Sequence, residues 1–237
     1  MKPSLLVLAL VAAASPVLAT EWQPKAELGV VNTTGNSDTT SINGKFALNG
    51  EDERLTQDYS FTGLRSESED ELSANRYELG GKLARKFGER QYLGGVVRYE
   101  NDDFAAYDYQ ATLALNYGFW ALQDDTRSLQ LEGGPGLRRA RLAESGESES
   151  DGLLRGFADY QHQLTESTQF YNTLLVEASP DNRFLQNDIG IAVSINRSLA
   201  LKAGFQARHN TDVPDDRKRT DTLSSINIVW SPKASAR

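Results

Sequence analysis

Charged side chains that recur at every second position are the residues of this chain most able to do chemistry. The cations in such positions are Lys25, Lys45, Arg76, Lys82, Arg98, Arg138, Arg155, Lys202 and Arg208. The anions are Glu27, Asp58, Glu78, Asp108, Glu132, Asp159, Glu177, Asp188 and Asp221. Nine charges of each sign on one face predict ion pairs across an enclosed interior, because a selective pore more naturally carries a ring of one sign.

Histidine is the residue best suited to act as a general base near neutral pH, and the chain has two, His162 and His209. His209 shares its parity with Phe205 and Ala207, which predicts an outward position near the external rim, and Ser224 could lie beside it. The pair resembles, in kind, the arrangement of outer-membrane phospholipase A, although no motif of that enzyme is present. Because spacing reveals neither an oriented base nor an oxyanion donor, a lipid hydrolase is only the second hypothesis.

Carboxylates and amides in two predicted external loops are the best candidates for binding a cation. Asn36 and Asp38 precede the second predicted strand, whereas Asn210 and Asp212 follow the eleventh. The full calcium-loop pattern is absent, and Asn, Asp and Gly are ordinary turn residues. No metal or cofactor is therefore expected. A structural barrel that binds ions or partners through acidic external loops is the third hypothesis.

Segments with a period of two must position these residues, since apolar and polar side chains alternate along a strand. The clearest runs from Tyr107 to Phe119, with aromatic residues at both ends and aliphatic residues between them. This order is typical of a membrane-spanning strand with interfacial girdles, and it predicts that Tyr107 faces outward and Asp108 inward. Pro135 in the seventh segment predicts a bulge or a local kink.

About twelve such segments lie between residues 25 and 230, within a range of 10 to 14. The odd-numbered connections are polar and mostly longer, at 32–38, 66–71, 101–106, 143–151, 179–182 and 210–219. The even-numbered ones are mostly tight, as at 88–90, 165–167 and 196–198. This alternation predicts a closed antiparallel transmembrane β-barrel with both termini in the periplasm. A soluble sandwich or lipocalin-like barrel is less favoured, because it would fill its own core with charges.

The first 19 residues have the apolar core and small residues of a secretory signal peptide, which leaves a barrel over 20–232 and a tail over 233–237. The chain has no cysteine, and its formal net charge of −8 argues against a nucleic-acid partner. Acidity concentrates at 66–71 and 144–151, which predicts solvated loops. The expected setting is the outer membrane, with lipid and the barrel assembly machinery as partners for a monomer.

Four stretches resemble the YdiY-like family of salt-induced outer-membrane proteins, which have no assigned activity. They are TTGNSDTTSING at 33–44, DYQHQL at 159–164, RHNTD at 208–212 and RKRTDT at 217–222. The resemblance implies a barrel serving as a narrow channel or in envelope maintenance under ionic stress, and it supplies no catalytic residue. A twelve-stranded interior can be plugged or can pass small solutes or ions. Such barrels commonly end on an aromatic residue, whereas SPKASAR follows Trp230 here.

Overall fold

The computed structural model describes residues 20–33, 39–68, 71–213 and 218–232, in which all regular structure is β-strand. The strands are β1 (Glu21–Thr33), β2 (Thr39–Glu51), β3 (Leu55–Ser68), β4 (Glu71–Lys86), β5 (Gln91–Asp102), β6 (Tyr107–Gln123), β7 (Arg127–Leu142), β8 (Ser148–Gln163), β9 (Thr168–Ala178), β10 (Arg183–Ser194), β11 (Leu199–Asn210) and β12 (Thr220–Trp230). The predicted twelve strands are therefore confirmed. Within these ranges no helix is long and apolar enough to cross a membrane.

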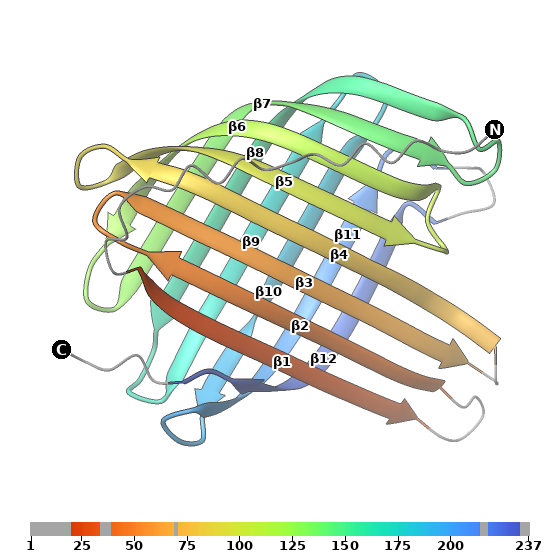
Figure 1. The fold of residues 1–237 in the computed structure, drawn as a ribbon. Coiled ribbons are helices and arrows are strands. Elements are labelled where there is room, and N and C mark those ends of the chain that lie inside the picture. The colour runs from red at the N-terminus through yellow and green to blue at the C-terminus, as the bar shows by residue number, and fades with distance from the viewer. Residues whose placement is uncertain (1–19, 34–38, 69–70, 214–217, 233–237) are drawn as a thin grey trace.

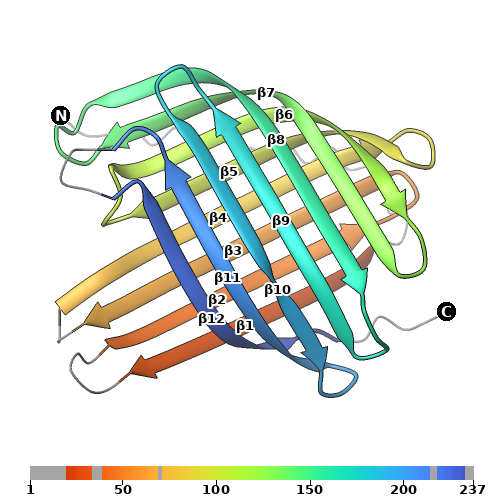
Figure 2. The ribbon, with the colours of Figure 1, turned by 180° about the vertical axis from the view of Figure 1, so that it is seen from behind.

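Each strand pairs antiparallel with its neighbours in sequence, and β1 pairs with β12 to close the barrel. Figures 1 and 2 show the strands running obliquely around a single closed layer. Followed once around the barrel, the register returns to β1 displaced by about 16 residues, which tilts the strands by about 45°. Closure leaves no sheet edge unpaired, as hydrocarbon requires.

The two ends of the barrel differ in their connections. β1 begins and β12 ends at one end, which we call the terminal end, and its five hairpin turns are three or four residues long. We call the opposite end the loop end, where the connection over 211–219 is the longest. In the terminal-end turns Asp52 accepts the N–H groups of Arg54 and Leu55, and Asp124 accepts those of Thr126 and Arg127. These bonds lower the pKa of both carboxyl groups and hold the tight turns.

The acidic stretches are only partly loops, contrary to prediction. β3 extends through Ser68 and β8 begins at Ser148, so much of 66–71 and 144–151 is paired strand. The physical reason is their alternation: one set of side chains meets water, while Glu149 and Asp151 turn toward Arg138 at 3.3 and 3.1 Å. The contrast in connection length is consequently smaller than predicted.

The outer face carries large apolar side chains that remain exposed in the isolated barrel. Leu28, Leu115 and Leu137 are 60, 63 and 65% exposed. Aromatic rings meet near both ends, as Trp22 does with Tyr59 near the terminal end. The sequence predicted these faces, and together they form an apolar belt with aromatic borders, the surface expected of a barrel in lipid.

One local prediction is wrong, and another is wrong in part. The register shifts between Tyr107 and Tyr109, so Tyr107 turns inward and is only 2% exposed. Asp108 lies instead at the rim, half-exposed, where its carboxylate faces Arg141 at 3.6 Å. Across Pro135 the register with both neighbouring strands is unchanged, so the predicted bulge does not form, although pairing with β6 is interrupted between Ala114 and Tyr117. Gly134 and Gly136 flank the proline and allow β6 to approach closely.

Candidate functional site: the charged lumen

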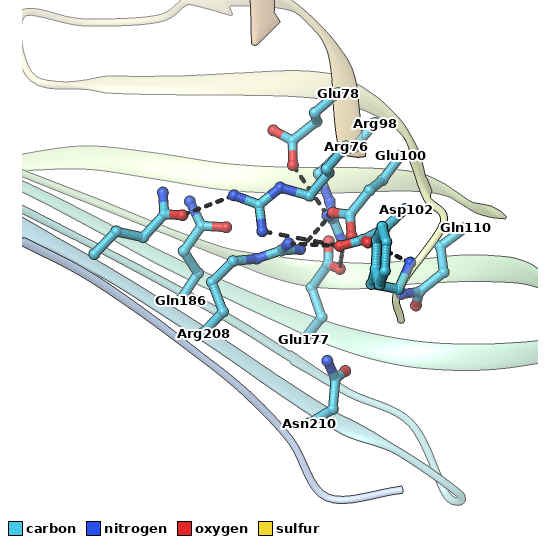
Figure 3. A network of polar contacts seen from close by, with 12 residues as sticks. Arg76, Glu78, Arg98, Glu100, Asp102, Gln110, Glu177, Gln186, Arg208 and Asn210 are labelled. Carbon is cyan, nitrogen blue, oxygen red and sulfur yellow. Dashed lines mark hydrogen bonds and ion pairs between the residues drawn. The ribbon is translucent and has the colours of Figure 1, made fainter. Parts of the chain in front are cut away.

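Four buried side chains meet in the loop-end half of the lumen and form what we call the closing cluster: Arg98, Glu100, Glu177 and Arg208. Arg98 donates to Glu100 at 2.8 Å and to Glu177 at 2.6 Å, and Arg208 donates to Glu100 at 2.6 Å. Figure 3 shows the side chains converging from separate strands. β5 and β11 are six strands apart in the ring of twelve, so the contact between Glu100 and Arg208 spans the barrel. The cluster closes the lumen at this level.

Further polar residues surround the closing cluster. Glu78 accepts from Arg98 at 3.3 Å, and Asp102 lies 3.8 Å from Arg208 and 4.0 Å from Arg76. Arg76 also donates to Gln206 at 3.0 Å, which links β4 to β11. Figure 3 shows Arg76 and Glu78 beside the cluster. This ring of partners compensates most of the enclosed charge.

Phe184 lies against both arginines of the closing cluster. Its ring is 4.9 Å from the guanidinium carbon of Arg98 and 5.0 Å from that of Arg208, and the side chain is only 3% exposed. Cation–π contacts between desolvated groups are attractive, because the ring face is electron-rich. The single aromatic ring therefore positions two cations that would otherwise repel each other.

A second network is centred on Glu132 of β7. Its carboxylate accepts from Lys82 at 2.9 Å, Arg155 at 3.0 Å and the Tyr92 hydroxyl at 2.7 Å. Lys82 also pairs with Asp58 at 3.1 Å. The Tyr92 ring lies against the wall over Gly118. A Cβ added to this glycine would be 2.1 Å from the ring.

A third network joins β1 to β11 around Glu27, which pairs with Lys25 at 3.1 Å and with Lys202 at 2.8 Å. The Lys202 ammonium lies 4.5 Å from the ring centre of Tyr171. Tyr171 in turn lies over two glycines of the wall, where any Cβ would meet its hydroxyl within 2.5 Å. The aromatic ring occupies the wall and leaves the lumen beside it open.

At the loop end, Arg138 and Tyr107 lie close to the residues that directly follow β11. The Arg138 guanidinium lies 4.8 Å from the Tyr107 ring, and the Tyr107 hydroxyl donates to Asp212 at 3.0 Å. Asn182 accepts the N–H of Asp212 at 3.1 Å and donates to Asn210 at 2.9 Å. These contacts hold the start of the connection over the barrel mouth.

Two cavities occupy the lumen between the terminal end and the closing cluster. One of about 620 Å³ extends from Glu21 and Glu51 at the terminal end to Arg98. The other, of about 350 Å³, reaches Arg76 and is lined mainly by polar side chains. Both are lined by Lys45 and Asp159, so they are adjacent parts of one space. This space extends from the terminal end toward the closing cluster.

The remaining candidates are not brought together. His209 is paired with Thr220, to which its Nδ1 is 2.9 Å, whereas Ser224 is paired with Phe205. Four strand positions, or about 13 Å, separate Ser224 from the histidine, so the predicted proximity is wrong. Asn36 and Asp38 lie outside the described residues.

The sequence prediction missed several lumen residues. Glu100 and Asp102 share the parity of Arg98, and extending the alternation by four residues would have found them. Tyr92, Phe157, Tyr171 and Phe184 were missed because aromatic residues were assigned to lipid. Their parity was the available signal, since each has the parity of a charged lumen residue on its own strand or on a paired strand.

The family model described as "Protein of unknown function, DUF481" matches residues 26–231. The chain belongs to the DUF481 family. This DUF481 chain is 23% identical over 204 residues to the Uncharacterized protein YdiY of Escherichia coli (strain K12), covering 86% of this chain and 80% of the relative. The predicted family resemblance is thereby confirmed.

Solved structures are similar to this DUF481 chain in fold. The COG4313 outer membrane channel from Pseudomonas putida F1 matches with a TM-score of 0.53 and 13% identity, over 92% of this chain and 97% of that one. The NanC porin matches with a TM-score of 0.51 and 7% identity, over 89% and 98%. At such identities the likeness is one of fold, and the fold is that of outer-membrane barrels.

Proposed function

We propose that this protein is an outer-membrane channel for small polar solutes or ions, whose lumen is closed in the present state by the closing cluster. The observation that carries the proposal is the cavity of about 620 Å³ that leads from the terminal end to Arg98 and has both charged and apolar residues in its lining. An unfilled interior forgoes the packing contacts that would stabilise a purely structural barrel. Two proteins of similar fold are named as a channel and a porin.

The closing cluster has properties that suit a barrier able to rearrange. Arg98 Nε, Arg208 Nε and Glu177 Oε1 are buried without a hydrogen-bond partner among the described residues. A partly satisfied network has alternative arrangements of similar energy, because its unpaired groups gain partners when water or an ion enters. Opening then requires movement of side chains only, while the strands stay paired.

The proposed orientation places the terminal end in the periplasm. Its short turns match the periplasmic turns of bacterial barrels, and the longer connections then face outward. A protease-accessible tag inserted within 143–147 is expected to be exposed on intact cells, and a tag after Glu166 is expected to be protected. The reverse result would mean that the terminal end faces the outside of the cell.

Planar-bilayer recording tests the channel directly. We expect a small conductance from the wild-type barrel and a several-fold larger one from the double variant Glu100→Ala, Arg208→Ala, which removes the contact across the lumen. The double variant Arg65→Ala, Glu67→Ala is the matched control, because it removes a 2.6 Å ion pair at an exposed position. Its conductance should equal that of the wild type.

Recordings at several salt concentrations extend the test to the link with ionic stress that the family resemblance implies. If the folded wild-type barrel and the opened variant both fail to conduct at every concentration, the channel proposal is wrong. A structural role in the envelope would then be the better reading. A hydrolase is not proposed, because His209 and Ser224 are not adjacent.

Insertion as a monomer by the barrel assembly machinery is part of the same proposal. β12 ends at Trp230, which pairs with Ala26 and Leu199 and is 44% exposed. An aromatic residue at the end of the closing strand suits the assembly signal of such barrels. Trp230→Ala should therefore reduce the amount of folded barrel, whereas deletion of residues 233–237 should not.

A further inference from the structure

The two cavities share a set of lining residues, which we call the waist, and its charges are only partly paired. Six charged side chains line both cavities: Lys25, Glu27, Lys45, Glu78, Asp159 and Asp188. Lys25, Glu27 and Glu78 belong to ion pairs described above. In the part of the chain that the structure describes, no ion pair within 4.0 Å involves Lys45, Asp159 or Asp188. These three are the charges a solute would meet.

The unpaired charges lie on opposite walls of the waist. Thr173 of β9 is paired with Asp159 on one side and Asp188 on the other, so the two carboxylates flank it in one row. Lys45 is on β2, six strands from β8 in the ring. Its side chain faces the lumen and is nevertheless exposed, which means that it projects into open space. Lys45 interacts electrostatically with Asp159 across this space and with Glu27, its cross-strand partner on β1, although it forms a salt bridge with neither.

Neutral amides fix the direction of both carboxylates without cancelling their charge. Asp188 accepts from Gln186 at 2.9 Å and from Gln206 at 2.7 Å. Asp159 accepts from Gln161 at 3.1 Å. A carboxylate oxygen accepts more than one hydrogen bond, so each group retains capacity for a ligand. Positioning of this kind lowers the entropy that binding must overcome.

We propose that the waist is a binding site for small amino-carboxylates, that is, solutes with a carboxylate at one end and an ammonium group at the other. The solute carboxylate binds Lys45, and its ammonium group binds the wall formed by Asp159 and Asp188. A simple anion meets two opposing carboxylates, and a simple cation meets the lysine, so only a zwitterion satisfies both walls. The site rests on the proposed function, since it names the solute class of that channel.

Binding measured by isothermal titration calorimetry on the detergent-solubilised barrel tests this without requiring conduction. Three probes share one carbon skeleton: 5-aminopentanoate, pentanoate and pentylammonium. We expect 5-aminopentanoate to bind at least tenfold more tightly than the others, because it alone makes charge-assisted bonds to both walls. Lys45→Met and Asp159→Asn should each weaken its binding roughly tenfold. Lys218→Met and Asp181→Asn are matched controls on exposed loop-end connections and should leave binding unchanged.

Charge reversal gives a gain-of-function test that misfolding cannot imitate. Lys45→Glu makes all unpaired waist charges negative, and the variant should prefer 1,5-diaminopentane to 5-aminopentanoate. Equal affinity for the three probes, or none, in a barrel shown to be folded by heat-modifiable gel mobility overturns the site. Selective binding in a barrel that never conducts would support the binding site and overturn the channel proposal.

Discussion

The loop-end and terminal-end halves of the lumen contain the same types of residue but use them in opposite ways. In the loop-end half, Glu100 and Arg208 are 2 and 5% exposed and joined across the barrel. In the terminal-end half, Lys45 projects into a cavity, and Asp159 has only amide partners. An inward position on a strand therefore does not by itself determine what a charged residue does. Its role depends on the partner that it contacts across the lumen.

Aromatic residues help to create the difference. Toward the loop end the Phe184 ring lies within 5.0 Å of two guanidinium carbons, and the Tyr107 hydroxyl donates to Asp212. Toward the terminal end Tyr92 and Tyr171 lie flat over glycines of the wall. A ring over glycine takes little of the lumen, whereas a ring that stands inward fills it. The inward glycines thus set where the barrel is hollow.

The largest effect is expected when a charge is removed from the closing cluster. Glu100→Gln leaves Arg98 and Arg208 without their shared partner in a desolvated place, which should lower the free energy of unfolding by about 3 kcal/mol. Urea titration in detergent, followed by tryptophan fluorescence, measures this. Glu67→Gln is the control, because the same change in an exposed ion pair should cost less than about 1 kcal/mol. Equal losses would mean that the cluster is hydrated.

The next largest effect is expected at Gly118, the glycine that the Tyr92 ring covers. A methyl group on Gly118 would lie 2.1 Å from the tyrosine ring, so Gly118→Ala must displace Tyr92 from Glu132 and should cost about 2 kcal/mol. Gly95→Ala, with nothing within 4 Å of the added carbon, should be nearly neutral in the same titration. A similar cost at both positions would show that general strand effects dominate.

Much of the barrel could be predicted from the period of two. Alternation specified the number of strands, the apolar belt and the inward charges, because one face of each strand must meet lipid and the other must not. Loop boundaries at 66–71 and 144–151 could not be predicted from acidity. Side chains such as Glu149 form strand when they have an inward partner, and Arg138 lies on a different strand.

The contacts within the lumen could not be predicted from local sequence patterns. The balance of charges predicted pairing, but which charges pair depends on the register around the whole barrel, and the contact of Glu100 with Arg208 joins residues six strands apart. A single bulge turned Tyr107 inward and moved Asp108 to the rim. Neither is visible in a window of a few residues, since the cause lies in pairing with β7.

A smaller effect is expected from the ring beneath the two arginines. Phe184→Leu keeps an apolar side chain of similar volume but loses both cation–π contacts, which should cost about 1.5 kcal/mol in the urea titration. Freed guanidinium groups should also let the lumen open briefly, seen as more frequent current steps. Phe205→Leu, on the lipid face, is the control and should affect neither measurement beyond its small change in burial.

The smallest expected effect tests whether the loop end has a second barrier in addition to the closing cluster. Tyr107→Phe removes only the hydroxyl that donates to Asp212 at 3.0 Å and should cost about 1 kcal/mol or less. If residues 211–213, which follow β11, form a second barrier, the variant should label faster at a cysteine placed at Asn210, while its conductance stays low because the closing cluster is intact. An increase in conductance from Tyr107→Phe alone would instead make these residues the main barrier. The closing cluster would then serve stability rather than closure.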